Sequence, residues 1–228
     1  MSRVGRPAKH DDRTREALLD AAEQLLATGG TEAVSVRAVA DEISESTRAV
    51  YSVIGSKPAL MHALTERGFA FLAELVEAVG ETEDPLEDLV KAGVQGFRRF
   101  ALERPHLFRI SFDQLTSEVI SDPGAYAQLL RSFNALHAKV ERAVRMGAIE
   151  PRPTIEIVFA FHSFCHGLAV NELSRLPPPV GANFWRFLSD ADGEQLWRLG
   201  LGAFTQGLAP GAAGPKSAGL RSRVARSG

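Results

Sequence analysis

Apolar residues along this chain repeat at intervals of three and four, which is the spacing of one face of an α-helix. The first run has the pattern i, i+3, i+4, i+7, i+8 and comprises Leu18, Ala21, Ala22, Leu25 and Leu26. Asp11 or Asp12 can cap the start of this helix, and Gly29-Gly30 is expected to end it. No segment has the alternating period of a β-strand, so the pattern predicts an all-α fold.

Two short helices are predicted next. The first starts after Ser35 and spans about two turns, and the second starts at Ser46 and ends at Gly55. The expected inward positions are Val36, Val39, Ala40 and Ile43 in the first helix and Val50, Val53 and Ile54 in the second. A longer helix follows over residues 57–80, with Pro58 in its first turn, where the missing N–H costs nothing.

Beyond residue 80 the pattern predicts long helices that are separated by proline and glycine. Their expected ranges are 85–104, 105–116, 123–147, 153–176 and 190–208. The P-P-P-V-G stretch at 177–181 predicts a stiff loop, and residues 209–228, rich in Gly, Ala, Ser and Arg, predict a disordered basic tail.

The aromatic residues divide the chain into two differently packed parts. All 13 phenylalanines lie between Phe69 and Phe204, and Tyr51 is the only aromatic residue before them. We therefore expect four regions: a flexible basic arm at 1–11, a helix-turn-helix unit at 12–57, a larger helical unit at 58–208 and the tail at 209–228.

The cysteine content and the hydropathy indicate the cellular compartment in which the protein is expected. Cys165 is the only cysteine, which excludes an intramolecular disulfide and a multi-cysteine metal site and favours a reducing compartment. The N-terminus lacks the apolar segment of a signal peptide, and no run of about 18 uncharged apolar residues occurs. We expect a cytoplasmic protein that does not span a membrane, and no motif indicates a cofactor.

A long helix followed by two short ones across a tight turn is the order of a helix-turn-helix, whose second helix enters the DNA major groove. The exposed edge of that second helix would carry hydroxyls and cations: Ser46, Thr47, Arg48, Tyr51 and Lys57. Hydroxyls and the helix N-terminus suit phosphate, and an arginine can form two hydrogen bonds with a guanine edge. The alternative is that Ser46 only caps a surface helix and Arg48 is solvated.

These segments resemble a known family. T-G-G at 28–30, S-V-R-A-V-A-D-E-I at 35–43, S-T-R-A-V-Y at 46–51 and S-K-P-A-L at 56–60 are similar to the DNA-binding domain of the tetracycline-repressor (TetR) family. The resemblance covers residues 12 to about 75. It implies phosphate contacts by Ser35, Arg37, Tyr51, Ser52 and Lys57, and base contacts by Thr47 and Arg48, with Ala49 a further candidate.

The chain departs from the family in the turn before the second short helix. Ser44 and Glu45 stand where the family usually has glycine and an apolar residue, and a left-handed conformation at Ser44 would cost roughly 1 kcal/mol. The charge of the predicted DNA-binding unit is unevenly distributed. Residues 1–57 carry a net charge of -1, but five basic residues lie near the N-terminus: Arg3, Arg6, Lys9, Arg13 and Arg15. The G-R-P tripeptide at 5–7 resembles arms that enter the minor groove.

The predicted helix over 153–176 is apolar nearly all round. Ile155, Val158, Phe159, His162, Cys165, His166 and Ala169 share one side, and Ile157, Phe161, Phe164 and Leu168 share the other. A helix without a polar face is buried on both sides, so we expect one side to pack in the subunit and the other against a second copy. The final helix would complete a four-helix homodimer interface, matching a palindromic operator on double-stranded DNA.

A second resemblance concerns the larger unit. R-P-H-L-F-R-I-S-F at 104–112 and F-H-S-F-C-H-G-L-A at 161–169 are similar to a TetR C-terminal class with a Trp-His-Gly signature, of which His166 and Gly167 match. Such domains bind small molecules that switch DNA affinity, so the resemblance implies a ligand-responsive regulator, and on family analogy a repressor. Candidate contacts to a small apolar effector are Phe97, Phe100, Phe108, Phe112, Phe133, His137, Phe159, His162 and His166. Alternatively, the phenylalanines only fill the core.

Two further alternatives concern the histidines. His162 and His166 stand at i, i+4 with Cys165 between them, a spacing able to hold a metal, but no third ligand is evident and Ser163 excludes an H-E-x-x-H protease. An enzyme that uses either histidine as a base would lack a partnered nucleophile and a phosphate-binding glycine loop. A helical scaffold or binding protein without a DNA role is the remaining possibility. We favour the regulator, without a metal and without catalysis.

Overall fold

The computed structural model of the chain describes residues 8–112, 121–174 and 193–212. All regular structure in these ranges is helical, which confirms the all-α prediction. The expectations for residues 1–7, for 113–116, for the loop at 177–181 and for most of the tail lie outside the described residues. Within the described ranges no helix has the length and apolar character needed to cross a membrane.

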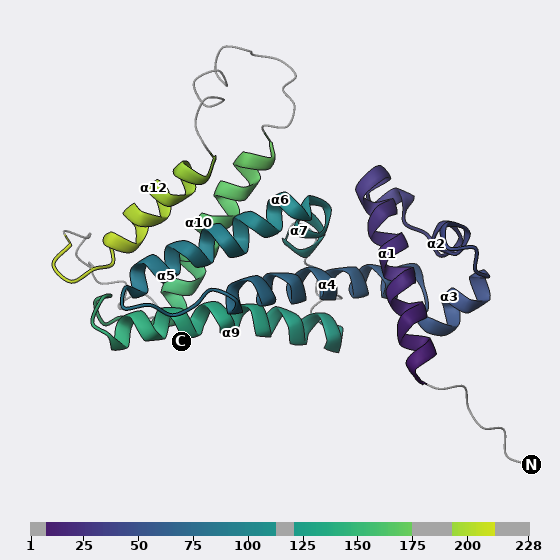
Figure 1. The fold of residues 1–228 in the computed structure, drawn as a ribbon, viewed down its shortest axis with the longest axis horizontal. Coiled ribbons are helices and arrows are strands. Elements are labelled where there is room, and N and C mark those ends of the chain that lie inside the picture. The colour runs from purple at the N-terminus through teal and green to yellow at the C-terminus, as the bar shows by residue number, and fades with distance from the viewer. Residues whose placement is uncertain (1–7, 113–120, 175–192, 213–228) are drawn as a thin grey trace, which may run out of the picture.

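Three helices form the N-terminal unit, which we call the head (Figure 1). They are α1 (Ala8–Ala33), α2 (Val36–Glu42) and α3 (Thr47–Val53). The small core between them consists of fully or almost fully buried aliphatic side chains, among them Leu18, Leu26, Val39 and Val50.

The first helix begins earlier than the sequence predicts. It starts at Ala8, so the last residues of the predicted arm are helical. At its other end the regular helix is interrupted at Gly30, whose φ of 65 and ψ of -164 are not helical, and a short second helical segment continues to Ala33 after this kink. The first segment therefore ends at the predicted glycines, since glycine has no Cβ and can adopt this conformation.

The fourth helix, α4 (Lys57–Glu77), leaves the head and runs into the larger unit, where it lies along α9 (Pro123–Arg145) (Figure 1). The other side of α4 packs against α7 (Pro105–Phe112) and the helices before it. Beyond these lie α10 (Thr154–Leu173) and α12 (Gly193–Gln206). One hydrophobic core runs from the head into this unit.

The helix predicted over 85–104 consists of three consecutive segments. They are α5 (Pro85–Lys91), the π-helical η1 (Ala92–Arg98) and α6 (Arg99–Glu103). Two glycines in η1 allow close approach on both sides: a Cβ at Gly93 would lie 2.3 Å from Leu201 Cδ1 of α12, and one at Gly96 would lie 2.8 Å from Val76 Cγ2 of α4. The π-helical turn is thus held between α4 and α12.

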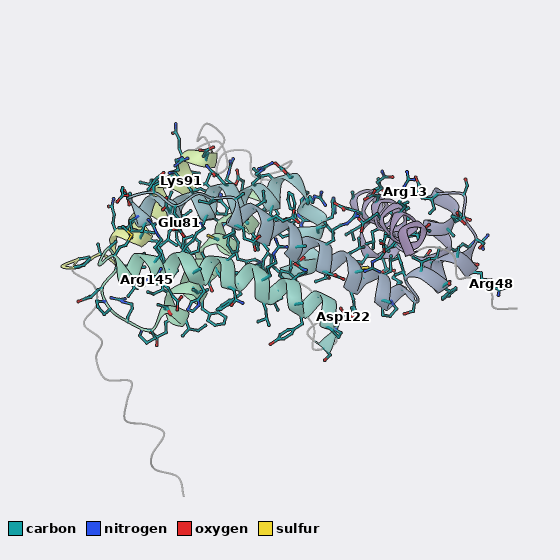
Figure 2. The ribbon with its side chains drawn as sticks, turned by 60° about the horizontal axis from the view of Figure 1, so that its bottom comes forward. Arg13, Arg48, Glu81, Lys91, Asp122 and Arg145 are labelled. Atoms are coloured by element: carbon teal, nitrogen blue, oxygen red, sulfur yellow. The ribbon has the colours of Figure 1, made fainter. Side chains whose placement is uncertain are left out.

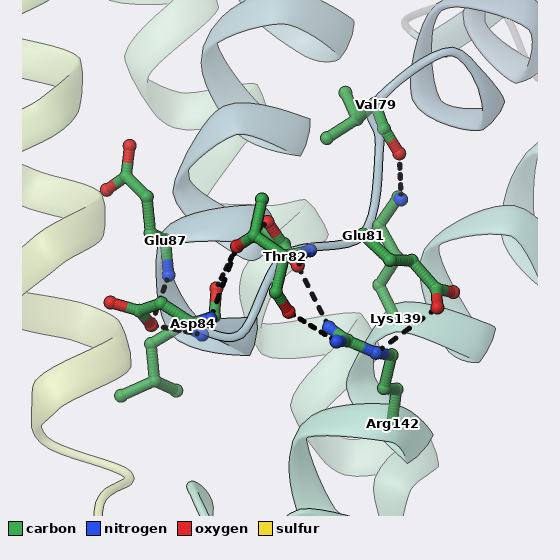
Figure 3. Close-up of polar contacts among 9 residues, drawn as sticks. Val79, Glu81, Thr82, Asp84, Glu87, Lys139 and Arg142 are labelled. Carbon is green, nitrogen blue, oxygen red and sulfur yellow. Dashed lines mark hydrogen bonds and ion pairs between the residues drawn. The ribbon is translucent and has the colours of Figure 1, made fainter.

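The loop between α4 and α5 is fixed by α9 (Figure 3). Arg142 donates to Asp88 Oδ2 at 2.9 Å and to the Thr82 carbonyl, and Lys139 Nζ donates to the Val79 carbonyl at 2.6 Å. Asp88 is only 2% exposed and accepts from the Thr82 amide and hydroxyl, both at 2.8 Å. Burial alone would raise the pKa of Asp88, but these hydrogen bonds and the Arg142 charge lower it.

The two sides predicted for α10 are not the sides observed. Val158, Cys165 and Ala169 are buried, but so are Ile157 and Phe161 from the opposite predicted side. The large exposed apolar residues of α10 are Ile155, Phe159 and Val170, all on one stripe. The burial boundary is therefore rotated from the predicted one, and the exposed stripe is narrower than a whole side.

Candidate nucleic-acid interface and aromatic cluster

The turn between α2 and α3 contains a left-handed residue at Ser44, where the family resemblance places glycine. Ser44 has φ 56, and it is the only residue other than glycine with positive φ in the described ranges. The Glu45 amide donates to the Ala40 carbonyl at 2.9 Å and closes the end of α2. Ser44 therefore takes the left-handed place that glycine usually fills, at a cost of about 1–2 kcal/mol.

The outer surface of α3 carries the predicted polar residues. Ser46 Oγ accepts from the Ala49 amide at 3.2 Å and caps the helix, while Val50 is fully buried against the head. This orientation leaves Thr47, Arg48 and Ser52 exposed, and Tyr51 is 60% exposed. Figure 2 shows Arg48 at the outer end of the head, pointing away from the rest of the chain.

The remaining predicted DNA contacts lie at the starts of the neighbouring helices. Ser35 Oγ accepts from the Ala38 amide at 3.1 Å and caps α2. Arg37 is exposed, with its Nε 3.9 Å from Asp41 Oδ2. Lys57 is the first residue of α4, which Ser56 caps, and its side chain is partly exposed. Serine thus caps the N-termini of α2, α3 and α4, and Arg37 and Lys57 lie in the first turns of α2 and α4.

Six of the predicted effector contacts form one aromatic cluster: Phe97, Phe100, Phe108, Phe112, His162 and His166. Ring centroids lie 4.9 Å apart for Phe108 and Phe112, 5.1 Å for Phe112 and His162, and 5.7 Å for Phe108 and His166. Phe100 joins through Phe108 at 5.6 Å. The two histidine rings of α10 are stacked at 6.2 Å. Residues from η1, α6, α7 and α10 therefore meet at one place beside α4.

The imidazole of His162 is uncharged at neutral pH. Burial, followed by the effect of His166, lowers the pKa of His162 to about 4. Its ring lies between Phe97 at 5.6 Å and Phe112 at 5.1 Å. The cluster therefore offers aromatic faces and a neutral hydrogen-bonding ring, which suits an apolar molecule with few polar atoms.

The other three predicted effector contacts do not belong to this cluster. Phe133 lies 5.9 Å from both His137 and Phe159, and no ring contact joins this trio to the six residues above. His137 Nε2 is hydrogen-bonded to Thr154 Oγ1 at 2.8 Å, and Phe159 is 60% exposed. The structure therefore does not bring these three residues to the cluster, because Phe159 lies about 60° around α10 from His162, beyond the edge of the buried face.

Two observations bear on metal binding at the histidines. Burial raises the pKa of the Cys165 thiol well above its usual value, so the thiol stays protonated at neutral pH. Among the described residues, no three His, Cys, Asp or Glu side chains gather closely enough to hold a metal ion. The described side chains of the cluster thus provide hydrogen bonding and aromatic contact.

One charged cluster joins α4 to α1 and has no signal in the sequence. Arg67 of α4 is paired with Glu16, Asp20 and Glu23 of α1, which are 44 to 51 residues away in the chain. Arg104 also reaches Glu23, over 81 residues. No motif or spacing connects residues so far apart, and only the packing of α1 across α4 brings them together.

Two family models match the chain. Residues 18–64 match the model described as bacterial regulatory proteins, tetR family, and residues 90–204 match the model described as tetracyclin repressor-like, C-terminal domain. The second model alone covers half of the chain. No curated protein matches the sequence.

Solved structures show the same fold at low sequence identity. A Rhodococcus sp. RHA1 protein of unknown function is 22% identical, with a TM-score of 0.72 over 86% of this chain and 95% of that one. The TetR-family regulator PfmR from Thermus thermophilus is also 22% identical, with a TM-score of 0.61 over 84% and 98%. AibR, solved with isovaleryl coenzyme A and operator DNA, is 18% identical, with a TM-score of 0.60 over 84% and 97%.

Proposed function

The chain belongs to the tetracycline-repressor (TetR) family of bacterial transcriptional regulators, and from this premise we propose that it is a ligand-responsive repressor. It binds a palindromic operator as a homodimer, and a small apolar effector in the larger unit lowers its affinity for that operator. The observation that carries the proposal is the surface of α3, where Val50 is buried and Arg48 and Tyr51 point outward.

The side chains around α3 have the chemistry of a major-groove interface. Arg48 can donate two hydrogen bonds to a guanine edge, and the hydroxyls of Thr47, Tyr51 and Ser52 suit phosphate or base contacts. Arg37 and Lys57 add cations on either side, and the N-termini of α2 and α4 attract phosphate. AibR, whose fold is similar, was solved in complex with operator DNA.

DNA binding is tested with duplexes that the protein selects from its own genome. Arg48→Ala should weaken binding in a fluorescence anisotropy titration by roughly 5- to 150-fold, because one arginine–guanine pair contributes about 1–3 kcal/mol of discrimination. Arg145→Ala is the matched control, since it removes an exposed arginine at the opposite end of the molecule (Figure 2). Equal affinities of the two variants would argue against α3 as the DNA-contacting surface.

The aromatic cluster supports an uncharged, largely apolar effector. Phe108 and Phe112 supply ring faces, and His162 supplies a neutral imidazole that can donate or accept one hydrogen bond. Both phenylalanines belong to α7, which packs on α4 and on α1. An effector that favours a different position of α7 would shift the population toward a state in which α4 holds the head differently.

The effector site is tested by thermal shift over a library of apolar compounds, followed by operator release. A compound that raises the melting temperature and weakens DNA binding should lose both effects in His162→Phe. It should keep both effects in His137→Phe, because His137 lies in the separate trio. The reverse pattern would move the effector site to Phe133 and Phe159.

The exposed apolar residues of α10 and α12 support the homodimer. Phe159 is 60% exposed and Leu199 is 72% exposed, although both are large and apolar. A second copy that covers them would remove this surface from water. Leu199→Glu should therefore yield a monomer in light scattering at micromolar concentration. Leu102→Glu, which alters an exposed leucine on α6, should leave the dimer intact.

A further inference from the structure

Arg67 is the main polar connection between α4 and the first helix of the head. Its Nη1 donates to Asp20 Oδ1 at 2.7 Å and to Glu23 Oε2 at 3.1 Å, and its Nη2 donates to Glu16 Oε2 at 2.6 Å. The three acceptors occupy one face of α1 at i, i+4 and i+7. The Arg67 side chain is only 17% exposed, so a single guanidinium holds two turns of α1 against α4.

A second arginine reaches the same cluster from the effector side. Arg104 caps the end of α6 and donates to Glu23 Oε2 at 3.3 Å, so Glu23 accepts from both arginines. The Arg104 guanidinium also lies 4.4 Å from the ring centroid of Phe71. The next residue begins α7, the helix that carries Phe108 and Phe112. Both arginines and the three carboxylates of α1 line one groove of about 290 Å³.

The environment makes Arg67 difficult to replace. Burial lowers the pKa of Arg67, but hydrogen bonds to Asp20, Glu16 and Glu23 outweigh that effect and raise it. Exposed ion pairs contribute little, but this side chain is largely buried and has three acceptors. Without the guanidinium, three carboxylates on one face of α1 would face α4, and Arg104 contacts Glu23 among them. Repulsion among them would favour rotation of α1 away from α4.

Such a rotation would matter because DNA binding depends on the direction of α3. The α2 and α3 helices pack on α1 and on each other, so the head turns with α1. Two heads of a homodimer must present α3 to successive major grooves at about 34–36 Å. A small change in the α1–α4 angle is therefore enough to take α3 out of register with its half-site.

We propose that Arg67 is a positioning residue for DNA binding: it touches no DNA, and by holding Glu16, Asp20 and Glu23 it fixes the angle of the head on α4. Glu23 connects this contact to Arg104 and hence to the start of α7. The inference rests on the proposed operator binding, which supplies the measurement.

The first test compares operator affinity over a series of salt concentrations. If Arg67→Met leaves about a tenth of the molecules with a competent head angle, the affinity falls about tenfold. Because no phosphate contact is lost, the slope of log affinity against log salt concentration stays the same. The paired charge swap Arg67→Asp with Asp20→Arg should recover most of the affinity. The control Arg131→Met removes an arginine that pairs with Glu77 between α9 and α4, away from the head, and should change nothing.

The second test measures the head angle without DNA. Spin labels are attached at Arg48→Cys and Arg145→Cys in a Cys165→Ser background, and the labelled protein is diluted with unlabelled protein. The labels report the distance, within one protomer, between the head and the opposite end of the larger unit (Figure 2). Arg67→Met should broaden or shift this distance distribution, and Arg67→Lys should do so less. Far-ultraviolet circular dichroism checks that each variant is folded, and a variant that is not folded is replaced by Arg67→Gln.

The outcomes separate the inference from the function on which it rests. If the wild-type protein selects no duplex, both the operator proposal and this inference are wrong. If it binds DNA and Arg48→Ala weakens binding, but Arg67→Met leaves affinity and distance unchanged, only the role of Arg67 is wrong. A changed salt slope in Arg67→Met would also overturn it, because the residue would then contact phosphate.

Discussion

A methyl group at position 93 would test how closely α12 is fitted to η1. Gly93 is buried, and an ideal Cβ there would lie 2.3 Å from Leu201 Cδ1, 3.3 Å from Leu201 Cδ2 and 3.4 Å from Cys165 Sγ. The first distance is far inside van der Waals contact, and Leu201 is fully buried. Close-packed neighbours leave Leu201 little room to move, so Gly93→Ala should strain the junction of η1 and α12.

The expected effect depends on which side chain stands at position 201. Overpacking costs about 1–3 kcal/mol, and alanine is favoured over glycine in a helix by about 1 kcal/mol, so Gly93→Ala should destabilise by about 0–2 kcal/mol. Leu201→Ala alone should cost about 2–5 kcal/mol because it leaves a cavity. In that background the new methyl enters the cavity and gains about 0.8 kcal/mol of burial. Gly93→Ala should then stabilise by about 1–2 kcal/mol.

Urea denaturation of the four proteins completes a double-mutant cycle. All four must be compared at one protomer concentration, because the stability of a dimer depends on concentration. The expected result is a change of sign in the effect of Gly93→Ala between the two backgrounds. Equal effects within about 0.5 kcal/mol would mean that the two positions act independently, and the close contact at η1 would be refuted.

Three further predictions follow from single side chains. The pKa of Asp88 is lowered because its hydrogen bonds and the Arg142 charge outweigh its burial. The ionised carboxylate therefore stabilises the fold above the unfolded pKa of about 4, and this stability is lost as the pH falls through the folded pKa. Asp88→Asn should lower the free energy of unfolding at neutral pH and reduce the loss of that free energy during acid titration. Burial lowers the pKa of His162 to about 4. The free energy of unfolding should therefore be constant above pH ~6.5 and fall by about 3 kcal/mol as the pH approaches 4, because the unfolded state takes up the proton first. His162→Phe should remove this fall, measured as the pH dependence of the urea midpoint. Ser46→Ala should weaken the start of α3 by about 1 kcal/mol, measured as faster hydrogen exchange of the Ala49 amide.

The order of the helices in the head could be predicted because its signals are local. Serine caps, a short apolar repeat and a glycine or proline at each boundary lie within a few residues of the helix that they define. The left-handed turn at Ser44 could also be expected, since the resemblance places glycine there and the structure gives φ 56. The interruption of α1 at Gly30 could be predicted as well, but not the short helical segment that continues to Ala33 after the kink, because glycine permits several directions for the chain that follows.

Features that join distant parts of the chain had no comparable signal. The π-helical turn depends on Gly93 and Gly96 meeting α12 and α4, and glycine in a helix pattern ordinarily indicates only a weak point. The Arg67 cluster likewise needs α1 and α4 to cross at one place. In both cases the residue type can be read from the sequence, but its contacts are determined by where two helices cross.

The separation of Phe159 from the histidine cluster has a different physical origin. A helix with a clear polar face indicates which residues turn inward, but the apolar residues of α10 surround its axis, so every side is a candidate for burial. The observed boundary is set by contacts with η1, α9 and α12, and the stacked histidines lie at its edge with Ile157 and Phe161 behind them. Phe159, three residues before His162, is on the far side of that edge. An apolar helix face thus predicts that something covers it, whereas whether that is the core, an effector or a second subunit is decided by the neighbouring helices.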